Sequence, residues 1–140
     1  MKTLKLLSIS FILFSFLTSC SSDDDNNSQD LTVKQMLMSG KWYLEKTNGV
    51  EVHPCRKSTF MHFYDDNKFT YAFYQESMDG TDCYLEYIQH GTFVLVGDIV
   101  VEVDFTDSNF DGYYEIISIT PNQLVIRESD LTFTFDKTEG

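Results

Sequence analysis

The chain has 140 residues, of which 10 are basic and 22 are acidic, so its formal net charge at neutral pH is −12. A negative charge of this size argues against nucleic-acid binding and against electrostatic attachment to anionic membranes. Hydrophobic residues make up 42% of the chain, which is enough to exclude a wholly disordered protein and to build the core of one ordinary domain.

The first 19 residues have the layout of a secretory signal peptide. Lys2 and Lys5 precede an apolar run over residues 6–17, and small polar residues follow. The run is shorter than the ~20 apolar residues that a helix needs to cross a bilayer. Because this segment holds two lysines and no acidic residue, its removal would leave 8 basic and 22 acidic residues, a net charge of −14.

The signal segment is followed by a cysteine in the sequence Leu17-Thr18-Ser19-Cys20, which resembles the lipobox of bacterial lipoproteins. The resemblance implies that the Cys20 sulfur receives a diacylglycerol, that the chain is cut before Cys20 and that the freed amine is acylated. Three acyl chains anchor a protein firmly, whereas one is marginal. The alternative is an ordinary secretory signal followed by a structural cysteine. That alternative does not explain why the sequence Leu17-Thr18-Ser19-Cys20 occurs at this position.

Residues 20–30 are expected to form a disordered tether, because no apolar residue follows Cys20 and such a segment cannot offset its ordering entropy. The acidic run Asp23-Asp24-Asp25 is similar to the export signal that Bacteroidota lipoproteins carry just after the acylated cysteine. The resemblance implies a lipid anchor in the outer membrane with display at the cell surface. The alternatives are the periplasmic leaflet and a spacer without an export role.

Residues 31–140 are expected to form one domain that begins with a short helix. The helical window spans residues 31–39, where Thr32 can cap the helix and Gly40 ends it. Its apolar positions fall on one face, as an amphipathic helix requires: Val33, Met36 and Leu37.

From residue 41 onward, apolar and polar residues alternate between short turn signals, and the alternation is cleanest over residues 99–105. The expected strands are residues 41–45, 59–64, 68–75, 83–89 leading through Gly91 into 92–96, 99–105, 113–119, 123–128 and 131–135. The turn signals are residues 65–67, 97–98, 121–122 and 129–130. About eight antiparallel strands in this order predict an all-β up-and-down meander, and closure into a barrel would remove its edges.

Two further cysteines, Cys55 and Cys83, lie in the expected domain. In an oxidising compartment such a pair is most simply a disulfide. It would close a loop of 29 residues, for which chain entropy gives about 3.6 kcal/mol of stabilisation. A reactive nucleophile or a metal pair would need a base or further ligands, and only His53 lies close in the sequence.

Gly40-Lys41-Trp42, directly after the expected helix, resembles the Gly-x-Trp signature of lipocalins. The chain is more similar to the small lipocalin-like lipoprotein domains of Bacteroidota, which add a Gly-Thr-Phe element and two late strand motifs, here residues 91–93, 114–119 and 124–127. The resemblance covers residues 31–137. It implies an eight-stranded up-and-down barrel whose closed end is plugged by Trp42, preceded by a short N-terminal helix.

Two features depart from the lipocalin pattern. The Thr-Asp-Tyr signature is missing, since Thr106-Asp107 is followed by Ser108. Lipocalins also pack a late arginine over the tryptophan, a role for which Arg127 is the candidate here and Lys137 the alternative. A barrel of this strand number is either filled by side chains or holds one small ligand.

Aromatic side chains on two neighbouring strands are the candidate ligand-binding wall. Phe60 and Tyr64 belong to the first strand and Phe69, Tyr71 and Phe73 to the second. Tyrosine hydroxyls there would orient a bound lipid or planar molecule. The alternative is that these rings pack a solid core. His62, between Phe60 and Tyr64 on the same face, fits a core or rim histidine better than a ligand group.

No metal, cofactor or catalytic site is expected. Residues 107–112 match the first half of a calcium loop, but Ser118 stands where its bidentate glutamate should be, and such residues are common in hairpin turns. His53, His62 and His90 are scattered, and no nucleophile lies near a base at a useful spacing.

The sequence therefore predicts a lipid-anchored, lipocalin-like barrel that binds a small hydrophobic or aromatic ligand without catalysis. The alternative is a solid barrel that presents acidic loops, including Asp107 and Asp111, to a protein or glycan at the cell surface. Fold alone does not choose between these two functions.

Overall fold

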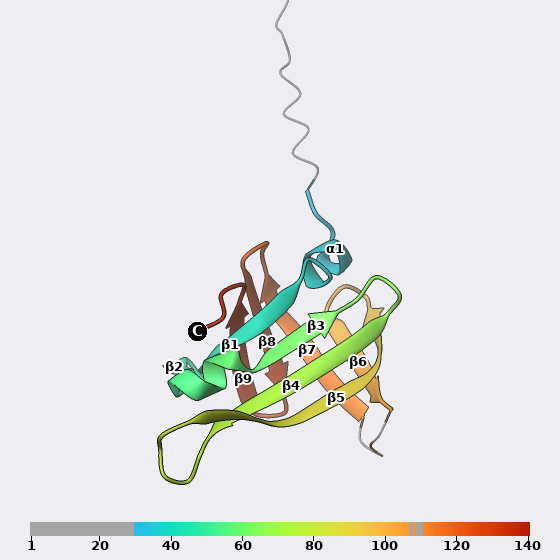
Figure 1. The fold of residues 1–140 in the computed structure, drawn as a ribbon. Helices are drawn as coiled ribbons and strands as arrows, with labels where there is room; N and C mark the ends of the chain where they lie inside the picture. Colours follow the sequence, from blue (N-terminus) through green and yellow to red (C-terminus); the bar gives the residue numbers. More distant parts are fainter. Residues whose placement is uncertain (1–29, 107, 109–110) are drawn as a thin grey trace, which may run out of the picture.

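The computed structural model describes residues 30–106, 108 and 111–140, and their strands form a single antiparallel sheet (Figure 1). The strands are β1 (Lys41–Thr47), β2 (Val50–Glu51), β3 (Phe60–Phe63), β4 (Lys68–Glu76), β5 (Cys83–Val96), β6 (Val100–Phe105), β7 (Asp111–Ile119), β8 (Gln123–Glu128) and β9 (Leu131–Asp136). The signal segment, Cys20 and all of the expected tether except residue 30 lie outside the described residues.

The sheet closes on itself because β9 pairs with β1 as well as with β8. Strands β1 and β3 to β9 make an eight-stranded up-and-down barrel, and the short β2 pairs only with the end of β1. The predicted barrel is confirmed. No helix among the described residues has both the length and the apolar character needed to cross a bilayer.

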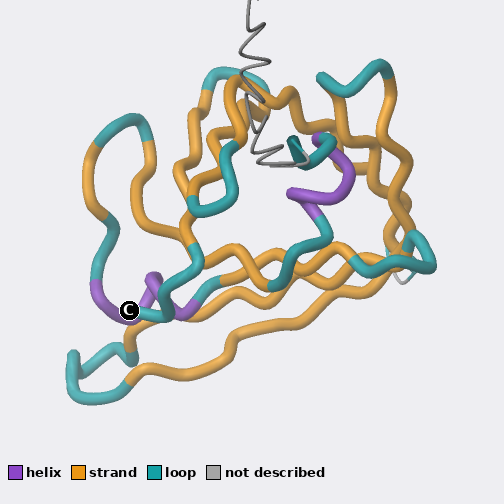
Figure 2. The backbone as a smooth tube through the Cα atoms, turned by 90° about the horizontal axis from the view of Figure 1, so that it is seen from above, coloured by secondary structure: helices purple, strands orange, loops and turns teal. Residues whose placement is uncertain are grey.

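The helix α1 (Val33–Leu37) is shorter than expected but begins at the predicted cap. The Thr32 hydroxyl accepts a hydrogen bond from the Gln35 amide, and the Gln35 side chain accepts one from the Thr32 amide. Helical geometry is lost at Met38, and Gly40 follows with a φ of 130°. Figure 2, viewed from above, shows α1 across one end of the barrel.

The predicted turns at 65–67, 97–98, 121–122 and 129–130 all connect consecutive strands. Three of them contain a residue with positive φ, namely Asn67, Asp98 and Ser129. Asn48, also at positive φ, precedes Gly49 in the turn between β1 and β2, which the sequence analysis did not predict.

Strand β5 runs without interruption through Gly91, in agreement with the predicted passage from residues 83–89 into 92–96. A Cβ atom at Gly91 would clash with the Asp104 carbonyl oxygen on β6. The glycine therefore allows the two backbones to approach closely within the ladder, and it does not end the strand.

The closed end of the barrel is packed with aromatic side chains beneath α1. Trp42 is fully buried, and its indole N–H donates a 2.8 Å hydrogen bond to the Leu37 carbonyl, which lies at the end of α1. The Phe63 ring packs 5.0 Å from Phe69 and 5.1 Å from Phe93 between centroids. These contacts leave this end of the barrel filled.

Lys137, and not Arg127, lies over the tryptophan. The Lys137 ammonium is 3.2 Å from the centroid of the Trp42 ring. Arg127 lies on β8 between two inward-facing positions, so it points outward and donates a 3.0 Å hydrogen bond to Glu115. The prediction for Arg127 is wrong, and the alternative residue takes its place.

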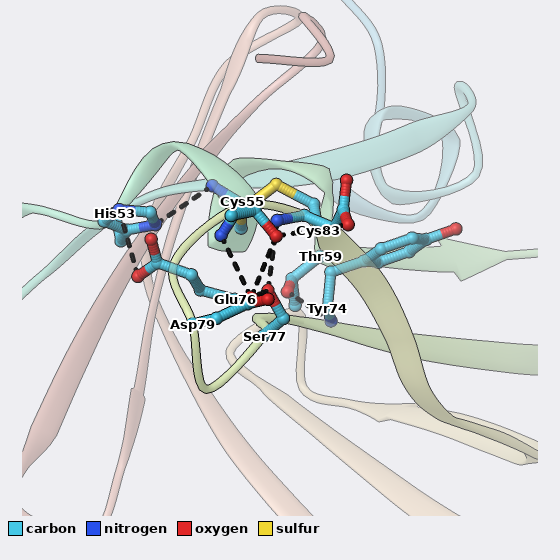
Figure 3. Close-up of a disulfide and its surroundings, with 10 residues drawn as sticks. His53, Cys55, Thr59, Tyr74, Glu76, Ser77, Asp79 and Cys83 are labelled. Atoms are coloured by element: carbon cyan, nitrogen blue, oxygen red, sulfur yellow. Dashed lines mark hydrogen bonds and ion pairs between the residues drawn. A yellow bond between two sulfur atoms is a disulfide. The ribbon is translucent and has the colours of Figure 1, made fainter.

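The opposite end of the barrel carries the 3₁₀ helix η1 (Pro54–Ser58) and the predicted disulfide, which is confirmed between Cys55 and Cys83 with Cα atoms 5.1 Å apart (Figure 3). The bridge ties η1 to the start of β5. Fully buried Thr59 accepts a 3.0 Å hydrogen bond from the Tyr74 amide, which ties the end of η1 to β4.

Candidate functional site

A cavity of about 360 Å³ lies inside the barrel, between the packed aromatic end and the end that carries η1. Its apolar wall consists of Leu44, Met61, Phe105, Phe133 and Phe135. Its polar wall consists of Tyr71, Tyr87, Gln89, Tyr114, Asp111 and Glu128, and Gly112 completes the lining. The interior of this barrel is therefore only partly filled by side chains.

The inner face of β4 carries three of the predicted site residues at different depths. Phe69 is 1% exposed and belongs to the packed end, where its ring lies 5.8 Å from Phe105. Tyr71, two residues further, lines the cavity. Phe73 lies at the mouth, where its ring stacks on Tyr87 with centroids 5.1 Å apart. The predicted common face is confirmed, and of these three residues only Tyr71 lines the cavity.

Phe60, from the neighbouring strand β3, faces the outside of the barrel. Its ring packs against Tyr43 at 5.9 Å, whereas Met61 and Phe63 occupy the buried positions of this strand. The sequence analysis chose the wrong face of β3, because both faces of this short strand carry large apolar side chains.

Tyr64 follows the end of β3 and is 37% exposed. Its ring lies 4.0 Å from that of His62 on the outer face. Burial and the nearby Lys41 ammonium lower the pKa of His62, so this histidine is neutral near pH 7. Neither Tyr64 nor Phe60 is among the residues that line the cavity.

Two tyrosines of the cavity wall, Tyr87 on β5 and Tyr114 on β7, are not among the predicted site residues. Tyr114 is only 7% exposed, and its hydroxyl makes no hydrogen bond with another described residue. Burial raises the pKa of both Tyr71 and Tyr114 well above the usual value for tyrosine. A Cβ atom at Gly112 would lie 2.8 Å from the Tyr114 ring, so this glycine makes room for the ring against β7.

Glu128 is the other missed residue, and it ends the inner face of β8. That face begins with the buried residues Leu124 and Ile126, and this alternation was visible in the sequence. The Glu128 carboxylate makes no hydrogen bond or ion pair with another described residue, and burial raises its pKa. The signal for Glu128 was therefore present in the sequence, since an acidic residue occupies the next alternate position after two apolar residues of the same strand face.

The charges around the cavity mouth are unevenly placed. The cavity lining contains two carboxylates, from Asp111 and Glu128, and no basic side chain. Arg56, on η1, lies just outside, with its guanidinium 5.0 Å from the centroid of the Phe73 ring. The Lys57 ammonium, next to Arg56, is 2.9 Å from the Glu45 carboxylate, which holds η1 against β1.

Within the described residues, no group of three or more histidine, cysteine, aspartate or glutamate side chains is placed to hold a metal ion. The calcium-like motif at 107–112 includes residues 107, 109 and 110, which lie outside the described part of the chain.

An up-and-down barrel with a tryptophan-sealed end and an internal cavity is the architecture of lipocalin-like proteins. The lipocalin-like domain family model matches residues 38–126, and the chain belongs to this family.

Two solved structures share the fold. A lipocalin-like protein from Bacteroides uniformis ATCC 8492 is 16% identical with a TM-score of 0.53, and the match covers 72% of this chain and 98% of that one. An uncharacterized protein from Bacteroides eggerthii DSM 20697 is 14% identical with a TM-score of 0.51, covering 71% and 98%. No curated protein matches the sequence.

Proposed function

We propose that this protein is a lipid-anchored carrier that holds a small hydrophobic or aromatic molecule in its barrel. The observation that carries the proposal is the cavity of about 360 Å³ with its largely aromatic wall. Ligand pockets commonly measure ~300–1,000 Å³. An engineered cavity of ~150 Å³ is enough to hold benzene, so this cavity suits a ligand with more than one ring or a short branched chain.

The lining favours binding without chemistry. The ionisable groups of the lining are the carboxylates of Asp111 and Glu128 and three tyrosines, and no histidine, cysteine, serine or lysine lies beside them to form a nucleophile and base pair. Three tyrosines from β4, β5 and β7 share the lining with five large apolar side chains, and their polar hydroxyls can orient a bound molecule. A non-catalytic carrier is therefore the function that the site supports best.

The lipid anchor in this proposal depends on the lipobox-like sequence that ends in Cys20, and surface display depends on the acidic run that follows. The described chain enters the domain at Asp30, just before α1 and the closed end of the barrel. A tether attached there leaves the cavity mouth clear of its own membrane linkage. This position is compatible with ligand exchange while the protein stays anchored.

Native mass spectrometry tests the carrier function. We expect residues 28–140, secreted into an oxidising periplasm, to carry a small-molecule adduct or to acquire one from host lipid extract. Protein that stays bare after this incubation would contradict the carrier and favour the alternative, a module that binds a surface protein or glycan.

A substitution in the cavity wall sharpens the test. Tyr71→Lys places a charge in the chamber, and we expect it to weaken uptake by about tenfold or more, because the ammonium would be desolvated by any apolar ligand. Tyr113→Lys is the matched control, since Tyr113 is 60% exposed on the outer face of β7. Equal uptake by both variants, each with a wild-type circular dichroism spectrum, would remove Tyr71 from the binding wall.

A further inference from the structure

We propose that the ligand is a hydrophobic amine, whose positively charged nitrogen binds between the Glu128 carboxylate and the tyrosine rings of the cavity. This inference rests on the proposed carrier function and adds the chemical class of the ligand. Four features of the cavity support it.

The first feature is a carboxylate without a partner. Glu128 lines the cavity, is half-buried, and makes no hydrogen bond or ion pair with another described residue. A carboxylate in such a place costs free energy unless a positive or hydrogen-bond-donating group approaches it. An ammonium group on a bound ligand would supply that group, whereas an anionic ligand would be repelled.

The second feature is the set of aromatic rings around this carboxylate. Tyr71, Tyr87 and Tyr114 line the same cavity as Glu128. The Tyr71 and Tyr87 ring centroids are 6.1 Å apart. Several electron-rich ring faces beside a carboxylate form the type of cage that binds alkylated ammonium groups.

The third feature is the Tyr114 hydroxyl. The Tyr114 side chain is only 7% exposed. It lines the cavity, and its hydroxyl has no hydrogen-bond partner among the described residues. A neutral hydroxyl can accept a hydrogen bond from an ammonium N–H. Tyr114 therefore offers a second acceptor on the same side of the cavity as Glu128.

The fourth feature is the position of the Arg56 charge at the mouth. The Arg56 guanidinium lies 5.0 Å from the centroid of the Phe73 ring on β4, and the cavity lining contains no basic side chain. The positive charge of a ligand is therefore best placed on the β7–β8 side of the mouth, away from Arg56.

The apolar part of the cavity wall indicates the chemistry of the rest of the ligand. Leu44, Met61, Phe105 and Phe135 form an apolar floor beneath the tyrosines. A molecule with a charged nitrogen and an apolar or aromatic body satisfies both parts of the cavity at once. A small hydrophilic amine would leave this floor without apolar contact.

Three probes with the same aromatic body test the inference by isothermal titration calorimetry at pH 7.5. They are 1-naphthylmethylamine, which is cationic, 1-naphthylmethanol, which is neutral, and 1-naphthylacetate, which is anionic. On the mature chain with Cys20→Ser, we expect the amine to bind about tenfold or more tightly than the alcohol, with the carboxylate weakest. Glu128→Gln should bring the amine to within about twofold of the alcohol and leave the alcohol unchanged.

The control is Glu102→Gln, since Glu102 is exposed on the outer face of β6 and its neutralisation should preserve the preference for the amine. Equal binding of all three probes would overturn the amine inference and leave the carrier function standing. Tightest binding of the carboxylate, lost in Arg56→Gln, would overturn it in favour of an anionic ligand. No binding of any probe at millimolar concentration would contradict both proposals.

Discussion

At the closed end of the barrel, the Lys137 ammonium lies 3.2 Å from the centroid of the Trp42 ring and 3.5 Å from the Gly40 carbonyl oxygen. The cation–π contact and the hydrogen bond compensate only in part for the water that the ammonium loses. Burial lowers the pKa of Lys137 from 10.5 to about 8. The side chain that covers Trp42 is therefore a lysine that loses its proton more easily in the folded protein than in the unfolded chain.

This shift has a consequence for stability against pH. Below pH 8 both states hold the proton, and the folded state bears the cost of the buried charge. Between about pH 8 and 10.5 the folded state has released a proton that the unfolded chain still binds, so the free energy of unfolding rises with pH. We expect a gain of about 1 kcal/mol, well below the full shift, because solvent still reaches the ammonium.

Urea unfolding of the wild type and Lys137→Met at pH 7.5 and pH 9.5 measures this gain. Methionine keeps an aliphatic side chain over Trp42 and removes the titrating group. The unfolding free energy of the wild type minus that of the variant should therefore be larger at pH 9.5 than at pH 7.5. Tyrosines and other titrating groups contribute equally to both proteins and cancel. Parallel pH profiles would contradict the assignment to Lys137.

The residue over Trp42 could not be chosen from the sequence alone. Arg127 and Lys137 are both basic residues late in the chain, and the choice between them depends on which way each side chain points. Arg127 alternates with the inward-facing Ile126, so it faces outward, whereas Lys137 lies beyond the last residue of β9 and folds back over the closed end. Only the closure between β1 and β9 brings Lys137 to the indole.

At the scale of elements, η1 and the β4–β5 hairpin form one side of the cavity mouth. The disulfide joins Cys55 of η1 to Cys83 of β5, and the His53 imidazole lies 3.3 Å from the Glu76 carboxylate at the end of β4 (Figure 3). Arg56 is held between these links, over the Phe73 ring. The covalent bridge therefore fixes the position of one wall of the mouth.

Removal of this bridge should have both a global and a local effect. We expect the double variant Cys55→Ala with Cys83→Ala to lose about 3.6 kcal/mol of unfolding free energy, since the unfolded chain regains the entropy of the opened loop. Hydrogen exchange should increase most in η1 and at the start of β5, and least in the strands around Trp42. A uniform increase throughout the barrel would contradict a local role for the bridge at the mouth.

The elements themselves were predictable because their signals are local. Turn residues such as Asn67 and Asp98 adopt positive φ in the structure, and short polar side chains at these positions were visible in the sequence. The cavity was not predictable in the same way, because it depends on strand phase and on contacts between distant strands. Phe60 was assigned to the inner face when Met61 occupies it, and Tyr114 and Glu128 meet Tyr71 only once the barrel closes.

At the scale of the whole molecule, the described chain begins beside α1 at the closed end of the barrel (Figure 1). The cavity lies toward the other end. A membrane linkage through residues 20–30 would therefore hold the domain by its sealed end. The acidic balance of the chain also keeps the domain away from anionic lipid headgroups, so the proposed anchor at Cys20 has to supply the attachment.

The anchor makes a direct prediction. In a bacterial host that processes lipoproteins, the wild type should incorporate labelled palmitate and fractionate with membranes, whereas Cys20→Ser should do neither, because the serine hydroxyl cannot take the thioether-linked lipid. Cys55→Ala should keep the label, since this cysteine is engaged in the disulfide. Palmitate incorporation into Cys20→Ser would contradict the lipobox interpretation. Degradation of the wild type by protease added to intact cells would support surface display.

For the proposed carrier, the covalent bridge would also set when the cavity mouth reaches its final form. A reducing cytoplasm keeps cysteine thiols apart, and the bond forms only in an oxidising compartment. For a chain exported as we propose, η1 is therefore not cross-linked to β5 before the precursor leaves the cytoplasm. The newly made protein would thus be a poor competitor for any cytoplasmic pool of its ligand, and crossing the membrane would complete its maturation.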